Sequence, residues 1–237
     1  MRVRTAIRAA GAGAALAGGV YAAYVALTWL RYGHPVSRRQ ESEALLDRFM
    51  PVYEVGDRHE IAVAAPADVT LTAASEVELT EAPLARAMFK GREWIMRSRP
   101  DGRPRPRGLV AEMQALGWGV LAHVPGRELV VGAVTRPWQA NVVFRALPPD
   151  DFASFAEPGY TKIAWTLRAD AVSSSRSIFS TETRAATTDA HARAKFRLYW
   201  SCLSPGIRLI RVAMLRAVKR EAEARARRPV AHEMVVP

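Results

Sequence analysis

An apolar stripe near the carboxyl end of the chain constrains the fold more than any other feature. Six large apolar residues recur there at spacings of three and four, the period of one helix face: Phe196, Trp200, Leu203, Ile207, Ile210 and Met214. Thr188 or Asp189 is suited to cap the start of this helix, and Pro205 with Gly206 is expected to kink or interrupt it. A stripe of this length has to be buried against another large element.

The segments before the stripe are predicted to be antiparallel strands. Residues 118–123 and 128–135 should pair around a tight turn, and "YTKIAWTLRAD" should pair with "RSIFSTETRAAT" around a Ser-rich turn. Upstream, "YEVGDRHEIAVAAP" alternates as a strand, and helices are expected at 66–75 and 84–96. An antiparallel sheet with an apolar face must cover it, and the last helix is the large amphipathic element available. The sequence therefore predicts an α+β fold, with a curved antiparallel sheet wrapped around a long C-terminal helix.

This order of elements resembles the START-like helix-grip superfamily (SRPBCC), which includes polyketide cyclase/dehydrase and lipid-transport relatives. The resemblance rests on the opening "HEIAVAAPADV" and on "IFSTETRAAT" running into "ARAKFRLYW", and it covers residues 53–226. It implies a hydrophobic cavity between sheet and helix for a lipid, sterol, polyketide or other apolar small molecule. Some relatives are cyclases or dehydratases and others only bind or carry, so the fold leaves the function open.

Residues 1–31 are interpreted as a membrane anchor. Residues 9–30 carry no charge, and as a helix they are long enough to span a hydrocarbon core of about 30 Å. Three aromatic residues lie toward the end of this segment, where interfacial aromatic residues belong: Tyr21, Tyr24 and Trp29. We expect a single transmembrane helix in the cell membrane with its N-terminus inside; a cleavable signal peptide is the alternative.

The remaining chain divides into a linker, one domain and a tail. Residues 32–52 form a polar linker with a short amphipathic helix, residues 53–226 the helix-grip domain, and residues 227–237 the tail. Residues 97–108 are rich in Pro and Arg and offer nothing to bury, so we expect a mobile loop.

The positive charge is concentrated outside the domain core. Residues 1–31, 92–107 and 216–228 account for the net charge of +11, so the rest is nearly neutral. This distribution favours a surface facing anionic lipid and argues against nucleic acid as a partner. The single Cys202 excludes an internal disulfide. We expect a monomer.

Residues that line the predicted cavity follow from strand alternation and from the helix stripe. The ligand-pocket candidates are Trp118, His123, Val130, Val134, Arg136, Trp138, Ile163, Trp165, Leu167, Phe196, Trp200 and Leu203. Glu182 and Arg184 join them if they point inward, where desolvation would demand partners or a polar ligand head group. The alternative we favour places both on the solvated face, paired with Lys162 or Arg168 across the hairpin.

No motif for catalysis or metal binding stands out. The five histidines are scattered, and Gly-x-Ser-x-Gly and Gly-rich phosphate loops are absent from the domain, so we expect no metal and no cofactor. The leading hypothesis is binding of an apolar small molecule or lipid rather than catalysis. The second is a cyclase or dehydratase in which at least two of His123, Arg136, Glu182 and Arg184 converge. The third is a non-enzymatic accessory protein whose basic segment at 216–228 docks on anionic lipid or an acidic partner.

Overall fold

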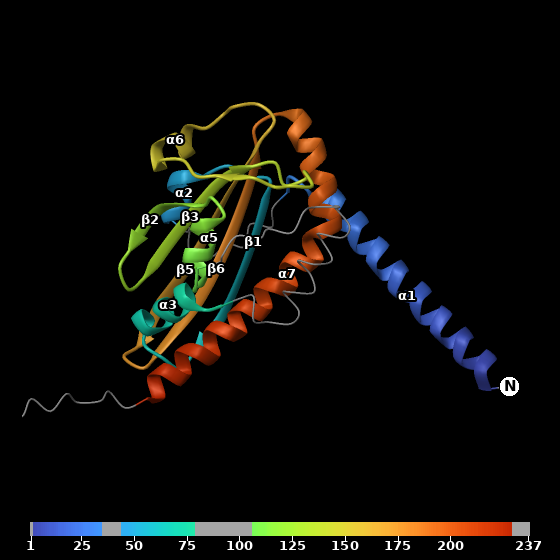
Figure 1. Cartoon of the computed structure of the whole chain (residues 1–237), viewed down its shortest axis with the longest axis horizontal. Coiled ribbons are helices and arrows are strands. Elements are labelled where there is room, and N and C mark those ends of the chain that lie inside the picture. Colours follow the sequence, from blue (N-terminus) through green and yellow to red (C-terminus); the bar gives the residue numbers. More distant parts are fainter. Residues whose placement is uncertain (1, 35–43, 79–105, 229–237) are drawn as a thin grey trace, which may run out of the picture.

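The computed structural model describes residues 2–34, 44–78 and 106–228 (Figure 1). The elements, in chain order, are α1 (Arg2–Arg31), α2 (Ala44–Phe49), β1 (Val55–Val63), α3 (Ala67–Glu76), α5 (Leu109–Ala115), β2 (Gly119–Val124), β3 (Glu128–Thr135), β4 (Phe144–Arg145), α6 (Pro149–Ser154), β5 (Thr161–Ser173), β6 (Arg176–Thr187) and α7 (Ala190–Arg227). The predicted helix at 84–96 and the predicted tail lie outside the described residues or at their margin, as does most of the predicted loop at 97–108.

The strands form one antiparallel sheet in the order β1-β6-β5-β3-β2, with β4 paired to β3. Both predicted hairpins are present, β2 with β3 and β5 with β6, and the first turns through Gly126 at φ 70°. Such a left-handed backbone favours glycine. The α+β prediction, with an antiparallel sheet and a long C-terminal helix, is confirmed.

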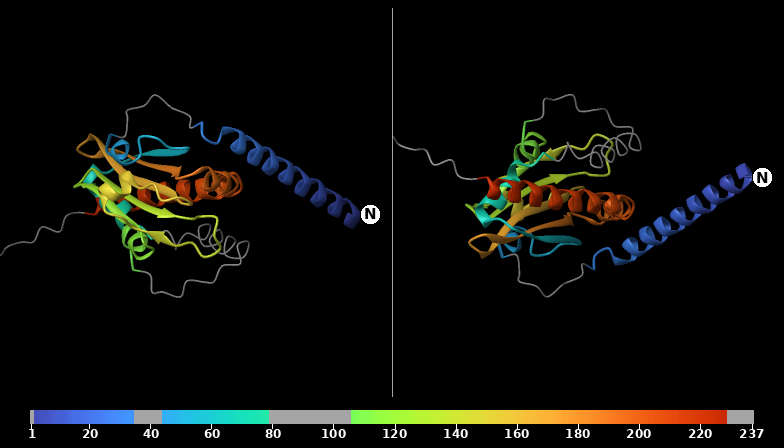
Figure 2. Two further views of the ribbon diagram at one scale, coloured as in Figure 1. Left: turned by 90° about the horizontal axis from the view of Figure 1, so that it is seen from above. Right: turned by 90° about the horizontal axis from the view of Figure 1, so that it is seen from below.

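Helix α7 packs along one face of this sheet. Met214, Leu215 and Val218 of α7 share a buried cluster with Trp165 and Phe179 of the sheet, and Figure 2 shows strands on both sides of the helix. The helix continues through Pro205 without interruption, but it bends, as Figure 1 shows. The bend agrees with the predicted kink, because a proline removes one helical hydrogen bond and crowds the preceding turn.

The opposite face of the sheet is also buried. Leu46, Phe49 and Met50 from α2 and its end, together with Phe152 of α6, pack on apolar residues of β3 and β5. All eight residues of β3 are buried. Alternate residues of this strand therefore point to two different faces, and both faces are buried and apolar. A strand with one solvated face would instead alternate apolar and polar residues.

Helix α1 contacts α7 through the aromatic residues of its C-terminal half. The Tyr21 hydroxyl donates to the Cys202 carbonyl at 2.7 Å, and the Tyr24 hydroxyl lies 3.1 Å from Ser204 Oγ. Arg197 donates to the Trp29 carbonyl and lies over the Trp29 ring. Figures 1 and 2 show the N-terminal part of α1 projecting from the rest of the molecule.

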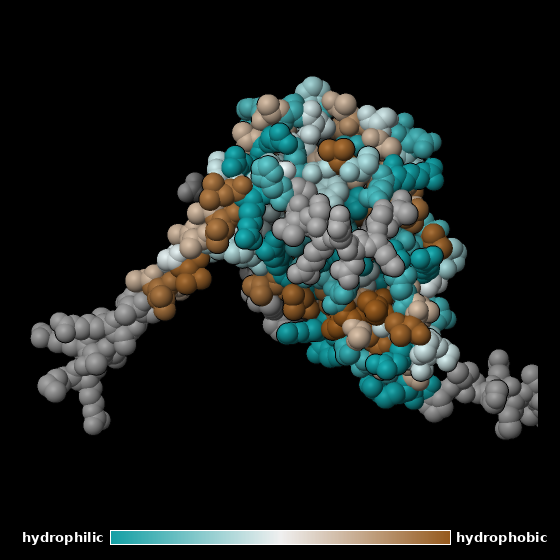
Figure 3. All heavy atoms as spheres, turned by 180° about the vertical axis from the view of Figure 1, so that it is seen from behind, coloured by the Kyte–Doolittle hydropathy of each residue, from teal (hydrophilic) through white to brown (hydrophobic). Residues whose placement is uncertain are grey.

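The membrane-spanning prediction for residues 9–30 finds no support in the structure. Within the described part of the chain, no helix, α1 included, combines the length and the apolar character needed to cross a membrane. Leu16, Val20, Leu27 and Leu30 are exposed on α1, and Figure 3 shows apolar residues along the described part of this helix. The tyrosines interpreted as interfacial contact α7 instead.

The basic segment at 216–228 is folded as the end of α7 rather than free. Lys219 donates to the Ala62 carbonyl at 2.6 Å and pairs with Glu223. Arg225 pairs with Glu221 on its own helix and with Glu76 of α3. These cations help to hold α7 against β1 and α3, and docking of this segment on lipid or on an acidic partner stays a prediction.

Candidate functional site

A layer of polar side chains crosses the interface between the sheet and α7. Asp57 and His59 lie on β1 at alternate positions between Val55 and Ile61, so they share the strand face that packs on α7. In the sheet register Asp57 lies opposite Thr183 and His59 opposite Thr181. Helix α7 adds two arginines to this layer, Arg208 and Arg211. The layer separates an apolar cluster around Trp200 from another around Met214.

The carboxylate of Asp57 contacts three side chains in this layer. Asp57 Oδ2 lies 3.0 Å from His59 Nε2 and 3.9 Å from Arg211 Nε, and Asp57 Oδ1 lies 3.3 Å from Arg208 Nε. The Asp57 side chain is 8% exposed, that of Arg211 13%, and that of Arg208 45%. Two guanidinium groups thus share a single counter-ion, so the layer carries an excess of positive charge.

Arg211 is the most deeply placed cation of the layer. Burial lowers the pKa of Arg211 to about 10, although the nearby Asp57 charge acts in the opposite direction. At neutral pH the group therefore remains charged. Its Nη1 donates to Thr181 Oγ1 at 3.3 Å, and its guanidinium lies 5.5 Å from the centroid of the Trp165 ring.

Some buried polar atoms around this layer have no hydrogen-bond partner among the described residues. They include Arg211 Nε and the Thr183 hydroxyl. Thr183 lies in register between Asp57 on one side and Trp165 on the other. Because an unsatisfied buried polar atom is costly, such atoms call for a specific explanation. Here they provide unused hydrogen-bonding capacity beside a buried cation.

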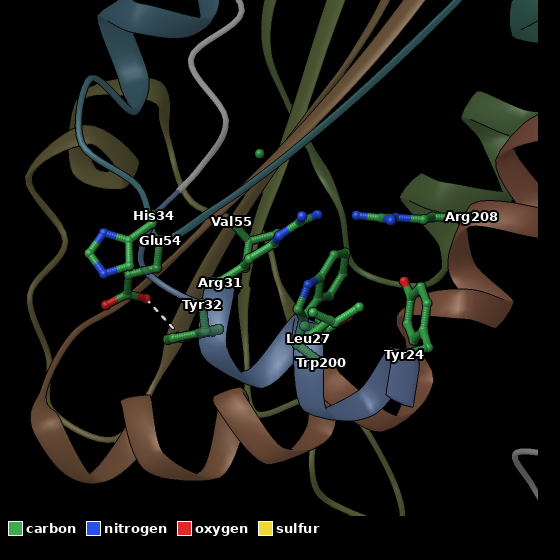
Figure 4. A pocket seen from close by; sticks show the side chains of 11 residues that line it. Tyr24, Leu27, Arg31, Tyr32, His34, Glu54, Val55, Trp200 and Arg208 are labelled. Atoms are coloured by element: carbon green, nitrogen blue, oxygen red, sulfur yellow. Dashed lines mark hydrogen bonds between the residues drawn. The ribbon is translucent and has the colours of Figure 1, made fainter. Parts of the chain in front are cut away.

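A pocket of about 160 Å³ opens beside the layer, between α1, β1 and α7 (Figure 4). Its lining comprises Tyr24, Leu27, Thr28, Arg31, Tyr32, His34, Glu54, Val55, Gly56, Trp200 and Arg208. The indole of Trp200, with Leu27 and Val55, forms an apolar wall. Arg208 belongs both to the pocket and to the polar layer. A second hollow of about 370 Å³ adjoins it at Tyr32 and His34.

The acid in the pocket wall is already engaged. Glu54 accepts hydrogen bonds from the Tyr32 hydroxyl at 3.1 Å and from the backbone N–H of Thr187 at 2.8 Å, and it pairs with Arg193 at 2.9 Å. Burial, reinforced by the Glu54 charge, raises the pKa of Tyr32, so its hydroxyl stays a donor. The wall thus offers cations and apolar surface to a ligand, but no free carboxylate among these residues.

The apolar pocket candidates on the α7 side of the sheet are mostly packed against one another. Trp165 and Leu167 lie in the cluster with Met214, and Trp118 packs at its margin. Phe196, Trp200, Ile163 and Trp138 belong to the cluster around Tyr32. Leu203 lies half-buried on α7. Of these candidates, Trp200 lines the pocket between α1, β1 and α7.

Four other pocket candidates lie away from the α7 interface. Val130 and Val134 are fully buried on the opposite face of the sheet, under α2 and α6. His123 is exposed near the end of β2. Arg136 lies over the Tyr160 ring and donates to the Gly159 carbonyl at 3.1 Å. The structure does not bring His123 and Arg136 together with a third polar candidate.

The interpretation that Glu182 and Arg184 lie on the solvated face of the sheet is wrong. Both are buried on the face opposite α7, where Arg184 Nε donates to Glu182 Oε1 at 2.7 Å and Arg184 Nη1 donates to the Met50 carbonyl at 2.9 Å. Asp47 of α2 completes the ion pair. Burial of α2 on the sheet is the reason, since it removes both side chains from water. They hold α2 in place and reach neither the polar layer nor the pocket.

The site residues that sequence reasoning missed are Asp57, His59, Arg208 and Arg211. A signal existed: Val55, Asp57, His59, Ile61 and Val63 alternate, so the polar pair had to share a face with buried apolar residues. On α7 the two arginines are three positions apart and flank the stripe residue Ile210. Among the described residues no group of three or more His, Cys, Asp or Glu could hold a metal.

Comparisons with known proteins give limited guidance. No protein-family model and no curated protein matches the chain. Among solved structures, the Zhui aromatase/cyclase from Streptomyces sp. R1128 is 18% identical, with 73% of this chain and 96% of that chain covered and a TM-score of 0.27. CalU16 from Micromonospora echinospora is 15% identical (71% and 84% covered, TM-score 0.25), and a hypothetical protein from Helicobacter pylori is 8% identical (76% and 94% covered, TM-score 0.34). At these TM-scores we draw no conclusion about this chain from them.

Proposed function

We propose that the chain is a ligand-binding protein of the START-like, helix-grip kind that takes an apolar small molecule or lipid in the pocket between α1, β1 and α7. A single observation carries the proposal: an apolar wall built on Trp200 adjoins a buried polar layer with unused hydrogen-bonding groups. Small-molecule sites commonly combine these two elements, apolar walls and a few placed polar groups.

The packing of the interface supports one location for the ligand. Farther along α7, Met214, Leu215 and Val218 fill the space against Trp165 and Phe179. The pocket lies at the other end of the interface, where the helix bends and α1 approaches. The ligand site is therefore proposed at this end, rather than along the whole interface that the sequence predicts.

Filling the pocket tests the proposal. Leu27 lies in the pocket wall on α1 and is 53% exposed, so Leu27→Trp should occupy the pocket with little effect on folding. Binding of 1-octanol and octanoate to the full chain, followed by NMR at the Trp200 indole N–H, should weaken about tenfold or more. Leu16→Trp is the matched control, on the same helix, 72% exposed and outside the pocket. Equal binding by both variants would contradict the proposal.

A second candidate function is acid–base catalysis of the cyclase or dehydratase kind. One contact favours it: His59 Nε2 lies 3.0 Å from Asp57 Oδ2, beside two arginines that could stabilise a developing oxyanion. In this candidate His59 transfers the proton and Asp57 orients the His59 ring, whereas His123, Arg136, Glu182 and Arg184 take no part.

A suitable assay for this candidate is the cyclisation of methyl 3,5-dioxohexanoate to a pyrone with loss of methanol, followed by absorbance. Acceleration by the wild type that His59→Gln abolishes is expected; a wild-type rate equal to the uncatalysed one would eliminate this candidate.

A further inference from the structure

Two arginines from distant parts of the chain meet at the pocket. Arg31 ends α1 and Arg208 lies on α7, and Figure 4 shows their guanidinium groups pointing toward one another across the space between Val55 and Tyr24. Two like charges directed at one space repel each other unless something negative lies between them. The arrangement is therefore suited to an anion.

The described side chains around this space supply little negative charge. Among the described residues, Arg31 makes no side-chain hydrogen bond or ion pair. Arg208 has Asp57 at 3.3 Å, but Asp57 also faces Arg211 and His59. Glu54, the carboxylate in the wall, is taken up by Tyr32, Thr187 and Arg193. Within the described residues, the pocket thus carries an excess of positive charge.

The apolar wall limits what kind of anion fits. Trp200 is 7% exposed, and Val55 6%, so both are held rigidly by the core from which the wall is built. Leu27 faces the same space from α1. A fully hydrated inorganic ion would gain nothing from these surfaces, whereas a ligand with an apolar portion would bury area against them.

We infer that the pocket selects amphiphiles with an anionic head group, a carboxylate or a phosphate, held between Arg31 and Arg208, with the apolar portion against Trp200. The inference rests on the proposed function and specifies the chemistry of the ligand. Both oxyanions match the planar donor fork of arginine, which binds either through paired N–H donors. Helix α1 is then part of the binding site, since it supplies one of the two cations and one side of the apolar wall.

The test compares three ligands with the same apolar chain: octanoate, octyl phosphate and 1-octanol. Each is titrated into the ¹⁵N-labelled full chain, and the Trp200 indole N–H, assigned with Trp200→Phe, reports binding. At least one of the two anions should bind the wild type about tenfold more tightly than the alcohol, with a preference that falls as salt is added. The anion with the higher affinity identifies the preferred head group.

Charge-removing variants locate the head group. Arg31→Gln and Arg208→Gln should each reduce the preference for the anion several-fold while leaving 1-octanol binding unchanged. Arg31 is exposed, so its replacement should not affect folding, and it keeps the test informative if Arg208→Gln is destabilised by the loss of Asp57 pairing. Arg176→Gln, an exposed arginine in the β5–β6 turn region, is the matched control and should change nothing.

The outcomes separate the inference from the function on which it rests. Equal affinities for octanol and both anions would overturn the head-group inference and leave the proposed function standing. An anion preference that survives both arginine variants would overturn the placement between Arg31 and Arg208. Failure of all three ligands to bind would overturn the proposed function and the inference together.

Discussion

Asp57 is the residue on which the polar layer depends. Its carboxylate is the counter-ion of buried Arg211 and also contacts Arg208 and His59. A buried ion pair often contributes little net stability, but removing one partner leaves the other charge uncompensated in a poor solvent. The layer therefore makes stability sensitive to a single side chain.

Asp57→Asn should destabilise the fold by about 3 kcal/mol, because it leaves the Arg211 cation buried without its counter-ion. Urea or guanidinium denaturation measures this loss in the free energy of unfolding. Asp170→Asn is the control, since Asp170 is 36% exposed and its pairs with Arg127 and Arg168 should contribute only about 0–1 kcal/mol. A free energy for Asp57→Asn within about 1 kcal/mol of the wild type would contradict this account of the layer.

Residue patterns predicted some residues of the site and missed others. Trp200 was found because it belongs to a helix stripe, and the period of the stripe is a strong signal. Arg208 and Arg211 were missed because charged residues are ordinarily assigned to the solvated face, and alternation in β1 was read only for its apolar members. Buried charged residues are exceptions to the rule that charged residues lie on the solvated face. Such exceptions are concentrated at binding and catalytic sites.

At the scale of elements, α7 is fixed at its start by a cap that ties it to the sheet. Asp189 is the N-cap residue, and its carboxylate accepts hydrogen bonds from the backbone N–H groups of Ala192, at 2.9 Å, and Gly159. These backbone donors, Ala192 first, lower the pKa of Asp189. The helix dipole favours the negative charge at the same position. Capping therefore links α7 to the loop before β5.

The cap predicts a pH dependence. Since the pKa of Asp189 is lowered by folding, the charged cap stabilises the protein fully above the ordinary value of 3.8, and this contribution is lost as the pH falls through the lower folded value. Wild type should therefore be more stable than Asp189→Asn at neutral pH, and the difference should shrink below pH 3.8. Melting temperatures of both proteins across this range provide the measurement. A difference that stays constant down to pH 2 would show that the charge has no part in the cap.

The elements themselves were largely predictable. Alternation and turn residues located both hairpins, and Pro66 correctly marked the start of α3. Helix α1 also exists where the uncharged run predicted a helix, whereas its membrane-spanning role finds no support in the structure. The hydroxyls of Tyr21 and Tyr24, residues that the sequence placed at a membrane interface, have partners on α7.

At the scale of the whole molecule, the sheet is buried on both faces, and this determined which pocket predictions failed. Strand β3 is apolar at nearly every position, so alternation could not tell the α7 face from the α2 face. Val130 and Val134 were therefore assigned to the wrong side of the sheet. Only the packing of α2 and α6, which depends on contacts between segments far apart in the chain, separates the two faces.

The proposed site combines residues from three elements. Strand β1 provides Val55 and the Asp57 layer, α7 provides Trp200 and Arg208, and α1 closes the pocket through the contacts of Tyr21 and Tyr24. The bend of α7 at Pro205 lies next to the carbonyl of Cys202 that Tyr21 reaches. Pro205 therefore lies close to the point at which α1 packs on α7.

Intermolecular nuclear Overhauser effects between octanoate and the full chain test the account most directly. We predict contacts from the octanoate methylenes to both the Trp200 indole and the Leu27 methyls, which face the same pocket from different helices. Contacts only to residues buried elsewhere, such as Trp165 or Phe152, or no contacts at all at saturating ligand, would contradict it.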